Sequence, residues 1–533
     1  MKIFSLTITL LILSFSLLSQ SNFNYSVYLK PIQIAGLTGL HSYTSAQSGN
    51  KILLIGGRKD GIHARQPFNA FPNASNNDSI FVVDLETKSV WKRSLSELSI
   101  PLQEQLQSTN MNHFQDADTL VLVGGYAYSN TAQDHITFPK MTTIPVNNLI
   151  SHIVNNEAIV SDFKQIEDQV FANTGGNLNK IGSTFYLIGG HRFDGRYNPM
   201  NNPTFTQTYL DGMVKFKLNN SGVNIQYSIL ETITDPIHLH RRDYNLLTQI
   251  GPQNEKKLVI SSGVFQISED LPFLYPVEIS ADTHVARTDF NQYLSNYHSA
   301  KSSLYSQSNQ TNYTLFFGGI SQYYYENGNL INDPTAPFVK TISLLKNQNG
   351  VYEEFKMDTE MPSLKGAGAN FFPSESLSKL EEEVILMDDF SGDSITIGHI
   401  FGGIESNSKS AFTDNQTDLT QADQNLYEVI LVKNANASIQ TIPNKNKFKF
   451  EIFPNPNDGI LNFTYTLEEK SEIYFYITDL NGKIVDEGLL SKNKKGENKC
   501  KLTLDKSLAN QELILTISRD YIDFDSKKFI LKR

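Results

Sequence analysis

Short apolar runs that lead into a glycine pair recur along most of the chain. Four copies are complete, at residues 53–57, 121–125, 186–190 and 315–319. A weaker copy lies at residues 399–403, and in a degenerate copy at residues 259–263 a serine replaces the first glycine. Continuous apolar runs are typical of strands that are covered on both faces. The paired glycines allow the backbone to leave such a strand with positive φ and to approach a neighbouring element closely.

The same succession of segments follows each copy. A long polar loop comes first and a strand comes next, as at residues 79–85, 213–218, 338–345 and 426–432. In several copies a further strand follows a turn, as at residues 89–93 and 223–230. A four-stranded sheet cannot bury both faces alone, but sheets stacked in a ring bury them against one another. The repeat therefore predicts an all-β chain whose main part is a β-propeller with six blades.

This pattern resembles the kelch repeat, whose blades carry an apolar strand that ends in Gly-Gly. The resemblance spans residues 26–442 and implies a six-bladed kelch-like β-propeller, which we assign to residues 21–443. The chain departs from the family because Trp91 is its only tryptophan, whereas kelch blades usually carry a Tyr and a Trp after the glycines. Its repeats are also longer than the kelch period of about 50 residues. We expect residues 26–29 to close the ring beside residues 426–432, with residues 438–442 as the alternative closing strand.

The N-terminus has the pattern of a secretory signal peptide. Lys2 precedes an apolar run at residues 3–18, and small or polar residues follow at Ser19, Gln20 and Ser21. The run is short for a membrane span and no later stop-transfer segment follows, so residues 1–20 are predicted to be removed on export. An N-terminal membrane anchor is the alternative. The single cysteine, Cys500, excludes an intrachain disulfide.

Residues 450–533 have the pattern of a separate small β-sandwich, which follows a short basic linker at residues 444–449. The segment opens on Pro454-Asn455-Pro456 and a turn at Gly459, after which apolar residues alternate along a strand. Asn481-Gly482 is a strong hairpin signal. Later apolar strands at residues 501–504 and 513–518 complete an immunoglobulin-like sandwich pattern.

This segment resembles the C-terminal sorting domain of the type IX secretion system of Bacteroidetes. The matching motif residues are Pro454, Asn455, Pro456, Gly459 and Gly482, together with the basic end at residues 527–533; residues 510–513 depart from the family's usual element. The resemblance implies the type IX secretion machinery as a partner, and a mature protein that is secreted or attached to the outer-membrane surface. The alternative is an ordinary sandwich that binds a ligand.

The charge of the chain narrows the classes of partner. The formal net charge is −11 and the sequence pI is near 5.5. An acidic surface repels phosphate backbones, so we expect no nucleic-acid partner. We also expect no transmembrane segment in the mature chain, no cofactor and no metal, and a monomer.

Candidate ligand-binding residues lie in the long loops after the glycine pairs, at residues 58–77, 191–211, 320–337 and 404–424. The richest stretch contains His191, Arg192, Asp194, Arg196 and Tyr197. Two guanidinium groups, a carboxylate and an aromatic ring could hold an anionic sugar, because Arg binds carboxylates and Tyr stacks on sugar rings. The alternative is that Asp194 only neutralises an arginine within a rigid loop.

A second candidate group is His240, Arg241 and Arg242, where the innermost strand of the fourth blade should begin. Together with His41, His113 and His298 in other blades, these residues could line a channel that binds an anion or a metal, or they could only form hydrogen bonds between blades. Tyr324 lies within an aromatic run on the loop of the fifth blade, where it could stack on a sugar or pack the loop.

No motif for nucleophilic, metal-dependent or phosphate chemistry is present, and we assign no catalytic residue. We therefore expect a binding module that recognises a glycan or protein ligand through its long strand 2–3 loops. An enzyme that acts on an anionic sugar, epimerase- or glycosidase-like, is the alternative. It would use Arg192, Arg196, Arg241 and Arg242 as carboxylate clamps near the channel mouth. A structural surface protein without a small ligand is a third possibility.

Overall fold

A computed structural model gives the structure of residues 23–533, except residues 199–203, 268, 435–439, 443–448, 468–469, 481–483, 491–492, 507, 509 and 520–522. The predicted signal peptide and nearly all of the predicted linker lie outside these residues. Within them, no helix is long and apolar enough to cross a membrane.

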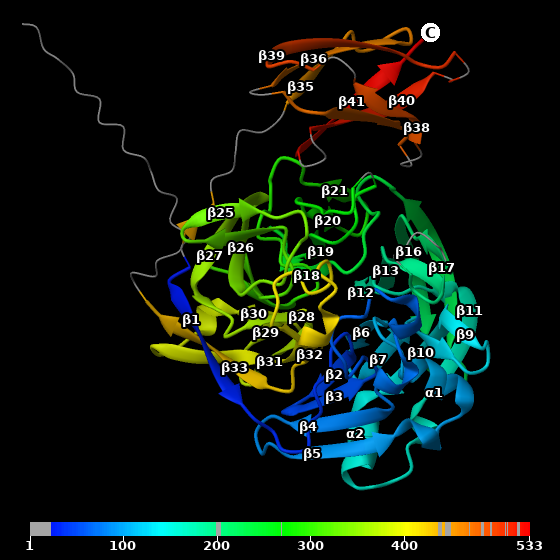
Figure 1. Ribbon diagram of the computed structural model, residues 1–533, viewed down its shortest axis with the longest axis vertical. Helices are drawn as coiled ribbons and strands as arrows, with labels where there is room; N and C mark the ends of the chain where they lie inside the picture. Colours follow the sequence, from blue (N-terminus) through cyan, green and yellow to red (C-terminus); the bar gives the residue numbers. More distant parts are fainter. Residues whose placement is uncertain are drawn as a thin grey trace, which may run out of the picture.

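The main part of the described chain is a ring of six antiparallel four-stranded blades (Figure 1). From the innermost strand outwards, the first blade contains β2 (Thr44–Ser48), β3 (Lys51–Ile55), β4 (Ser79–Asp84) and β5 (Val90–Ser94), and the second contains β6 (Asn112–Asp116), β7 (Thr119–Val123), β10 (Pro139–Pro145) and β11 (Lys164–Ala172). The third blade contains β12 (Asn177–Ile181), β13 (Thr184–Ile188), β16 (Gly212–Asn219) and β17 (Gln226–Thr234), and the fourth contains β18 (Asn245–Ile250), β19 (Lys256–Ser261), β20 (Val277–Ile279) and β21 (His284–Ala286). The fifth blade contains β22 (Ala300–Ser306), β23 (Thr311–Phe317), β26 (Thr341–Gln348) and β27 (Val351–Glu360), and the sixth contains β28 (Leu364–Pro373), β31 (Ser394–Ser406), β33 (Leu426–Lys433) and β1 (Tyr25–Ile32). The prediction of a six-bladed propeller is confirmed.

The glycine-ended runs are the second strands of the blades, and their side chains are buried between neighbouring blades. In β3 the four residues from Ile52 to Ile55 are 0% exposed. At the end of β7, Gly124 has φ +71°, and a Cβ there would lie 1.7 Å from the backbone oxygen of Asn173 in the next blade. Glycine is therefore required at this position both by the backbone conformation and by the close approach.

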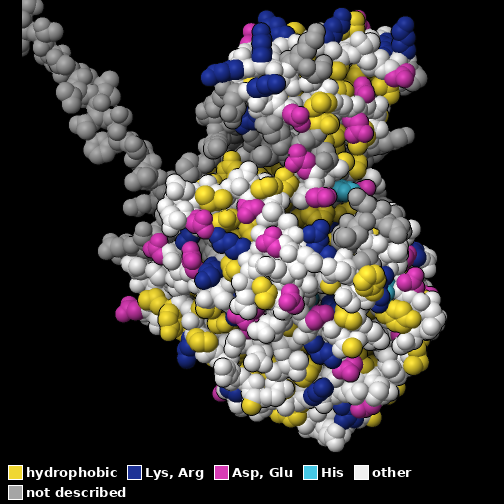
Figure 2. Space-filling model, viewed as in Figure 1, with side chains coloured by type: hydrophobic (Ala, Val, Ile, Leu, Met, Phe, Trp, Pro, Cys, Tyr) yellow, Lys and Arg dark blue, Asp and Glu magenta, His cyan; other side chains and the backbone are white. Residues whose placement is uncertain are grey.

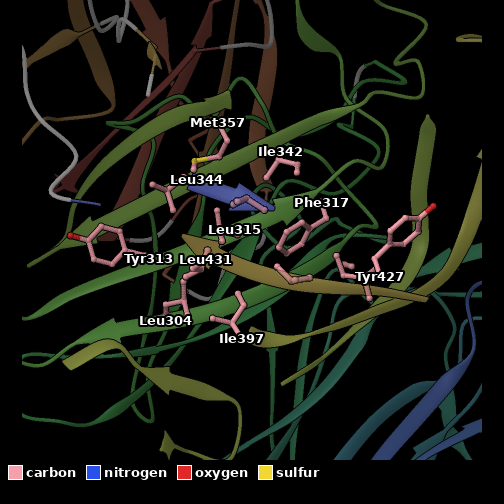
Figure 3. Close-up of a cluster of buried hydrophobic side chains, with 14 of the residues drawn as sticks. Leu304, Tyr313, Leu315, Phe317, Ile342, Leu344, Met357, Ile397, Tyr427 and Leu431 are labelled. Atoms are coloured by element: carbon pink, nitrogen blue, oxygen red, sulfur yellow. The ribbon is translucent and has the colours of Figure 1, made fainter. Parts of the chain in front are cut away.

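The N-terminal strand closes the ring, as the sequence predicts. β1 is the outermost strand of the sixth blade and pairs with β33, with Ser26 opposite Val432 and Leu29 opposite Val429. Val27 of β1 is buried in a cluster that joins the fifth and sixth blades, several of whose members are seen in Figure 3. The alternative closing segment has another partner, because β34 (Gln440–Thr441) pairs with β27 of the fifth blade.

Segments inserted between the blade strands form small elements of their own. Three hairpins follow glycine pairs: β8 (Tyr126–Ser129) with β9 (Asp134–Thr137), β14 (His191–Gly195) with β15 (Phe205–Tyr209), and β24 (Tyr323–Glu326) with β25 (Asn329–Asn332). β32 (Thr420–Ala422) extends the sixth blade, and the helices are α1 (Ile100–Leu106) and α2 (Val146–Val154). Many of the residues that the sequence predicts to lie in long loops therefore form ordered strands.

Another hairpin joins the first two strands of the sixth blade. β29 (Lys379–Leu380) pairs with β30 (Val384–Leu386), and β30 runs parallel to β22 of the fifth blade. Between the two strands, Glu383 accepts hydrogen bonds from Asn179 of the third blade and Thr248 of the fourth, at 3.3 and 2.5 Å. Since Asn179 and Thr248 lie on innermost strands, this carboxylate ties the hairpin of the sixth blade to the third and fourth blades beside the channel.

The C-terminal residues form a sandwich of two antiparallel sheets. One sheet contains β35 (Phe450–Phe453), β36 (Ile460–Leu467) and β39 (Gly496–Thr503), and the other contains β38 (Ile484–Leu490), β37 (Ile473–Thr478), β40 (Gln511–Arg519) and β41 (Asp523–Leu531). Side chains that alternate along the strands, such as Phe463, Phe475 and Leu515, fill the space between the sheets. The predicted β-sandwich is confirmed.

Candidate functional site at the channel mouth

Six equivalent residues surround the channel where the innermost strands begin. Each has a left-handed backbone, with φ between 53° and 74°: Ser42, Asn110, Gly175, Asp243, His298 and Gly368. Backbone hydrogen bonds of 2.6–3.2 Å connect them from blade to blade. In each bond the N–H of one residue donates to the carbonyl of its counterpart in a neighbouring blade: Ser42 to Gly368, Asn110 to Ser42, Gly175 to Asn110, Asp243 to Gly175, and Gly368 to His298. These bonds hold the start of each innermost strand in place. They fix Asp243 and His298 at the mouth.

Arg242 and Asp243 form the charged centre of this mouth. The Arg242 guanidinium pairs with the Asp243 carboxylate and donates a hydrogen bond of 3.2 Å from Nε to the Tyr209 hydroxyl. The Tyr209 ring stacks on His240, with centroids 3.8 Å apart, and His240 is paired with Asp211. Arg242 and Asp243 keep 21% and 14% of their side-chain surfaces exposed, so both groups remain in partial contact with solvent.

Aromatic side chains from three blades meet above this centre. His63, on the loop of the first blade, lies 4.7 Å from Phe71, 4.6 Å from Tyr197 of the third blade and 5.2 Å from Phe412 of the sixth, measured between ring centroids. Arg65 fixes the same loop to the sixth blade through a hydrogen bond of 2.6 Å to the Thr413 carbonyl. The long loops thus pack together rather than extending separately into solvent.

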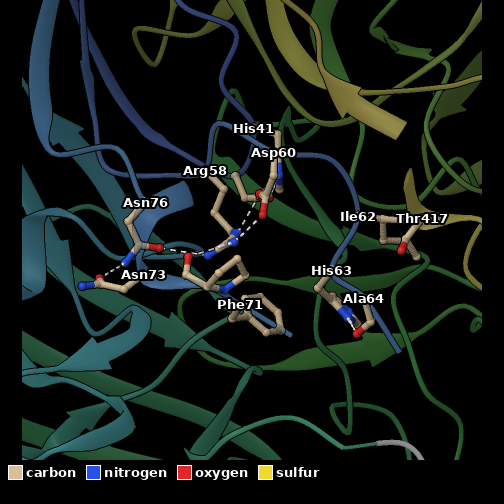
Figure 4. Close-up of polar contacts among 12 residues, drawn as sticks. His41, Arg58, Asp60, Ile62, His63, Ala64, Phe71, Asn73, Asn76 and Thr417 are labelled. Carbon is tan, nitrogen blue, oxygen red and sulfur yellow. Dashed lines mark hydrogen bonds and ion pairs between the residues drawn. The ribbon is translucent and has the colours of Figure 1, made fainter. Parts of the chain in front are cut away.

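Arg58 anchors the loop of the first blade (Figure 4). It is 2% exposed, pairs with Asp60 and donates a hydrogen bond of 2.9 Å to the Asn76 side chain. Burial alone would raise the pKa of Asp60, but hydrogen bonds from Arg58 and the nearby His41 ring, 3.7 Å away, hold it well below its usual range. Arg58 is therefore an internal part of the loop rather than a free cation.

His63 and His298 are neutral at neutral pH. Burial lowers the pKa of His63 to about 4 and also lowers the pKa of His298. The pKa of Asp243 is lowered because the positive charge of Arg242 outweighs the opposing effect of burial. The mouth therefore offers the Arg242–Asp243 and His240–Asp211 pairs, the neutral imidazoles of His63 and His298, and aromatic rings, a set without a large net charge.

Four of the sequence-predicted ligand residues lie at or beside this mouth: His191, Tyr197, His240 and Arg242. His191 is held by a hydrogen bond of 2.6 Å to Gln207, and its ring centroid lies 5.5 Å from that of Tyr209. Burial lowers the pKa of His191 to about 3.

The other predicted residues have partners elsewhere. Arg192 pairs with Asp194 at 2.5 Å and also donates to Gln169, while Arg196 donates to the Phe68 carbonyl at 3.3 Å. Tyr324 lies on the β24–β25 hairpin, where the Lys409 ammonium is 4.6 Å from its ring centroid.

Arg241 lies inside the fourth blade and is 0% exposed. Its guanidinium donates to the carbonyls of His238, Ser262 and Tyr275 at 2.8–2.9 Å and lies 4.1 Å from the ring centroid of Phe273. Arg192, Arg196, Arg241 and Arg242 therefore do not form a single carboxylate clamp.

Sequence reasoning missed Asp243, Tyr209, His63 and Phe412. Asp243 could have been found by aligning the repeats, since it is the left-handed residue equivalent to Ser42 and His298. The aromatic residues come from separate loops, and no spacing in the sequence indicates that these loops meet.

Across the described parts of the chain, no group of three or more His, Cys, Asp or Glu side chains is arranged to hold a metal ion.

Comparison with known proteins identifies the C-terminal sandwich. Residues 451–510 match the family described as the secretion system C-terminal sorting domain. The sandwich is a type IX sorting domain. The protein is thus exported by the type IX secretion system, to the outside of the cell or to its surface, and carries a propeller ahead of the sorting domain.

The opening motif of the sorting domain ties its first strand to its last. The Asn455 side chain accepts a hydrogen bond of 2.8 Å from the Ile530 amide, and Gly459 turns with φ +102° against Arg533. Pro454 and Pro456 flank this contact. Gly482 lies outside the described residues.

Solved structures resemble the chain only distantly. The structure of YjhT is 10% identical, with a TM-score of 0.41, and the alignment covers 76% of this chain and 99% of that one. A glycoside hydrolase family 43 arabinoxylan arabinofuranohydrolase from Bacillus subtilis is 9% identical, with a TM-score of 0.27 and coverage of 93% and 96%. No curated protein matches the sequence.

Proposed function

We propose that the exported propeller is a binding module that recognises a glycan at its channel mouth. The observation that carries this proposal is the Arg242–Asp243 pair beside the Tyr209–His240 stack, open to water under the aromatic loops. An Arg–carboxylate pair presents donors and acceptors side by side, which suits the vicinal hydroxyl groups of a sugar. Aromatic rings supply flat apolar surfaces for the faces of sugar rings.

The lack of a large net charge favours a neutral glycan over an anionic one. Asp243 already neutralises Arg242, and burial keeps His63 and His298 uncharged at neutral pH. The enzyme alternative requires several arginines around one carboxylate. Its support is weak because Arg241 is buried and Arg192 and Arg196 are engaged elsewhere.

A glycan array followed by calorimetry with the full chain tests this proposal. For any sugar that binds, Arg242→Met should lower affinity at least about tenfold, because a hydrogen bond to a charged group contributes roughly 1.5–3 kcal/mol. Arg192→Met is the matched control, since this arginine is also paired with a nearby carboxylate but lies away from the mouth, and it should leave affinity unchanged. The proposal fails if no glycan binds, or if both variants bind as the wild type does.

A further inference from the structure

The two sheets of the sorting domain differ in what covers their outer faces. In β37, Ile473, Phe475 and Ile477 point into the sandwich, so Tyr474, Tyr476 and Thr478 point outwards. The outward residues Tyr476 and Thr478 are nevertheless only 5% and 4% exposed. Thr516, paired with Tyr476 across the sheet, and Ser518, paired with Tyr474, are 1% and 0% exposed. This face is therefore covered by another part of the protein.

The fourth blade of the propeller contributes to that cover. Tyr476 belongs to the same buried cluster as Tyr275 and Ile279, and Tyr474 and Ile484 pack against this cluster. Figure 1 shows the sandwich lying next to the edge of the propeller formed by β20 and β21. The contact is largely aromatic and aliphatic, and it orients the sandwich on the propeller.

The opposite sheet faces away from the propeller and carries lysines. In β39, Cys500 and Leu502 pack towards the interior, so Lys499 and Lys501 point outwards, and both are exposed. Lys494 and Lys495, just before this strand, are also exposed. The acidic residues of this sheet are Glu497, 3.9 Å from Lys499, and Glu451, which pairs with Lys527. Figure 2 shows Lys and Arg side chains gathered on the part of the sandwich farthest from the propeller.

This basic face contrasts with the rest of an acidic chain, whose formal net charge is −11. We propose that the Lys499–Lys501 face of β39 is the surface that the sorting domain presents to an acidic surface of a protein in the export machinery. Docking of the Tyr476 face on the fourth blade keeps the lysines outward. Clustered like charges attract an oppositely charged partner and speed its association. The inference rests on the sorting role of this domain and is independent of the proposed glycan site.

Charge substitutions in the full chain, expressed in a bacterium with a type IX secretion system, test the proposal. The measurement is the fraction of the protein found outside the cell or on its surface, compared with the fraction retained in the periplasm. Lys499→Glu/Lys501→Glu should lower the exported fraction at least about tenfold, because like charges would then face each other across the contact. Lys217→Glu, at an exposed position of β16 in the propeller, should export as the wild type does.

The variant Lys499→Arg/Lys501→Arg tests whether the positive charge at these two positions, rather than the lysine side chain itself, is what export requires. This variant keeps both positive charges, so it should export as the wild type does. The proposal is overturned if the Glu variant is exported normally, or if the Arg variant is lost to the same extent as the Glu variant. Failure of glycan binding in the array would leave this result unaffected.

Discussion

Two consecutive arginines have opposite roles. Arg241 lies in the interior of the fourth blade, and Arg242 lies at the channel mouth. Arg241 is 0% exposed and its guanidinium is bound by three backbone carbonyls, whereas the Arg242 side chain is 21% exposed and pairs with Asp243. Consecutive residues of an extended chain point to opposite sides, so one enters the sheet packing and the next enters the channel. Residue type alone therefore does not distinguish a structural arginine from a candidate ligand residue.

Arg241→Met should produce the largest effect. Three carbonyl groups would lose a charged donor in a buried place, and we expect the free energy of unfolding to fall by about 3–5 kcal/mol. Urea unfolding followed by circular dichroism measures the change. A loss below about 1 kcal/mol would contradict the view that Arg241 is a structural part of the blade.

Arg242→Met, the matched substitution at the mouth, should cost less stability. It leaves the partly exposed Asp243 carboxylate without its ion-pair partner, and we expect a loss of about 1–2 kcal/mol in the same urea titration. The contrast between a structural Arg241 and an Arg242 at the mouth would be contradicted if Arg242→Met destabilised the protein as much as Arg241→Met does.

The smallest effect concerns pH. The pKa of His63 is lowered by burial from the ordinary value to about 4, so the unfolded chain binds a proton at a higher pH than the folded protein does. The contribution of His63 to stability is therefore complete above its unfolded pKa, about 6.5, and is lost as the pH falls towards 4. His63→Gln should reduce the difference in stability between pH 7 and pH 5 by about 1 kcal/mol, after allowance for the water that still reaches this side chain. An unchanged pH dependence in this variant would show that burial does not lower the pKa of His63 in the folded protein.

The sequence predicts the blades well because the burial of each second strand requires a continuous apolar run, such as residues 52–55, and the close approach at its end requires glycine. It also predicts the closing strand, since β1 and β33 have complementary strand patterns. The site is predicted only in part. Arg241 and Arg242 cannot be separated without the exact start of β18, and the meeting of His63, Tyr197 and Phe412 depends on loops far apart in the chain.

The closing strand also sets the order in which the protein can fold. The side chain of Asn434 reaches Ser26 across a sequence separation of 408 residues, and the sixth blade is incomplete until both ends of the propeller are present. Contacts of such long range slow folding, because the entropy of closing the loop must be lost before the contacts form. Until the sixth blade is complete, the faces of the first and fifth blades that pack against it therefore stay uncovered. The ring can close only after residue 433 has arrived.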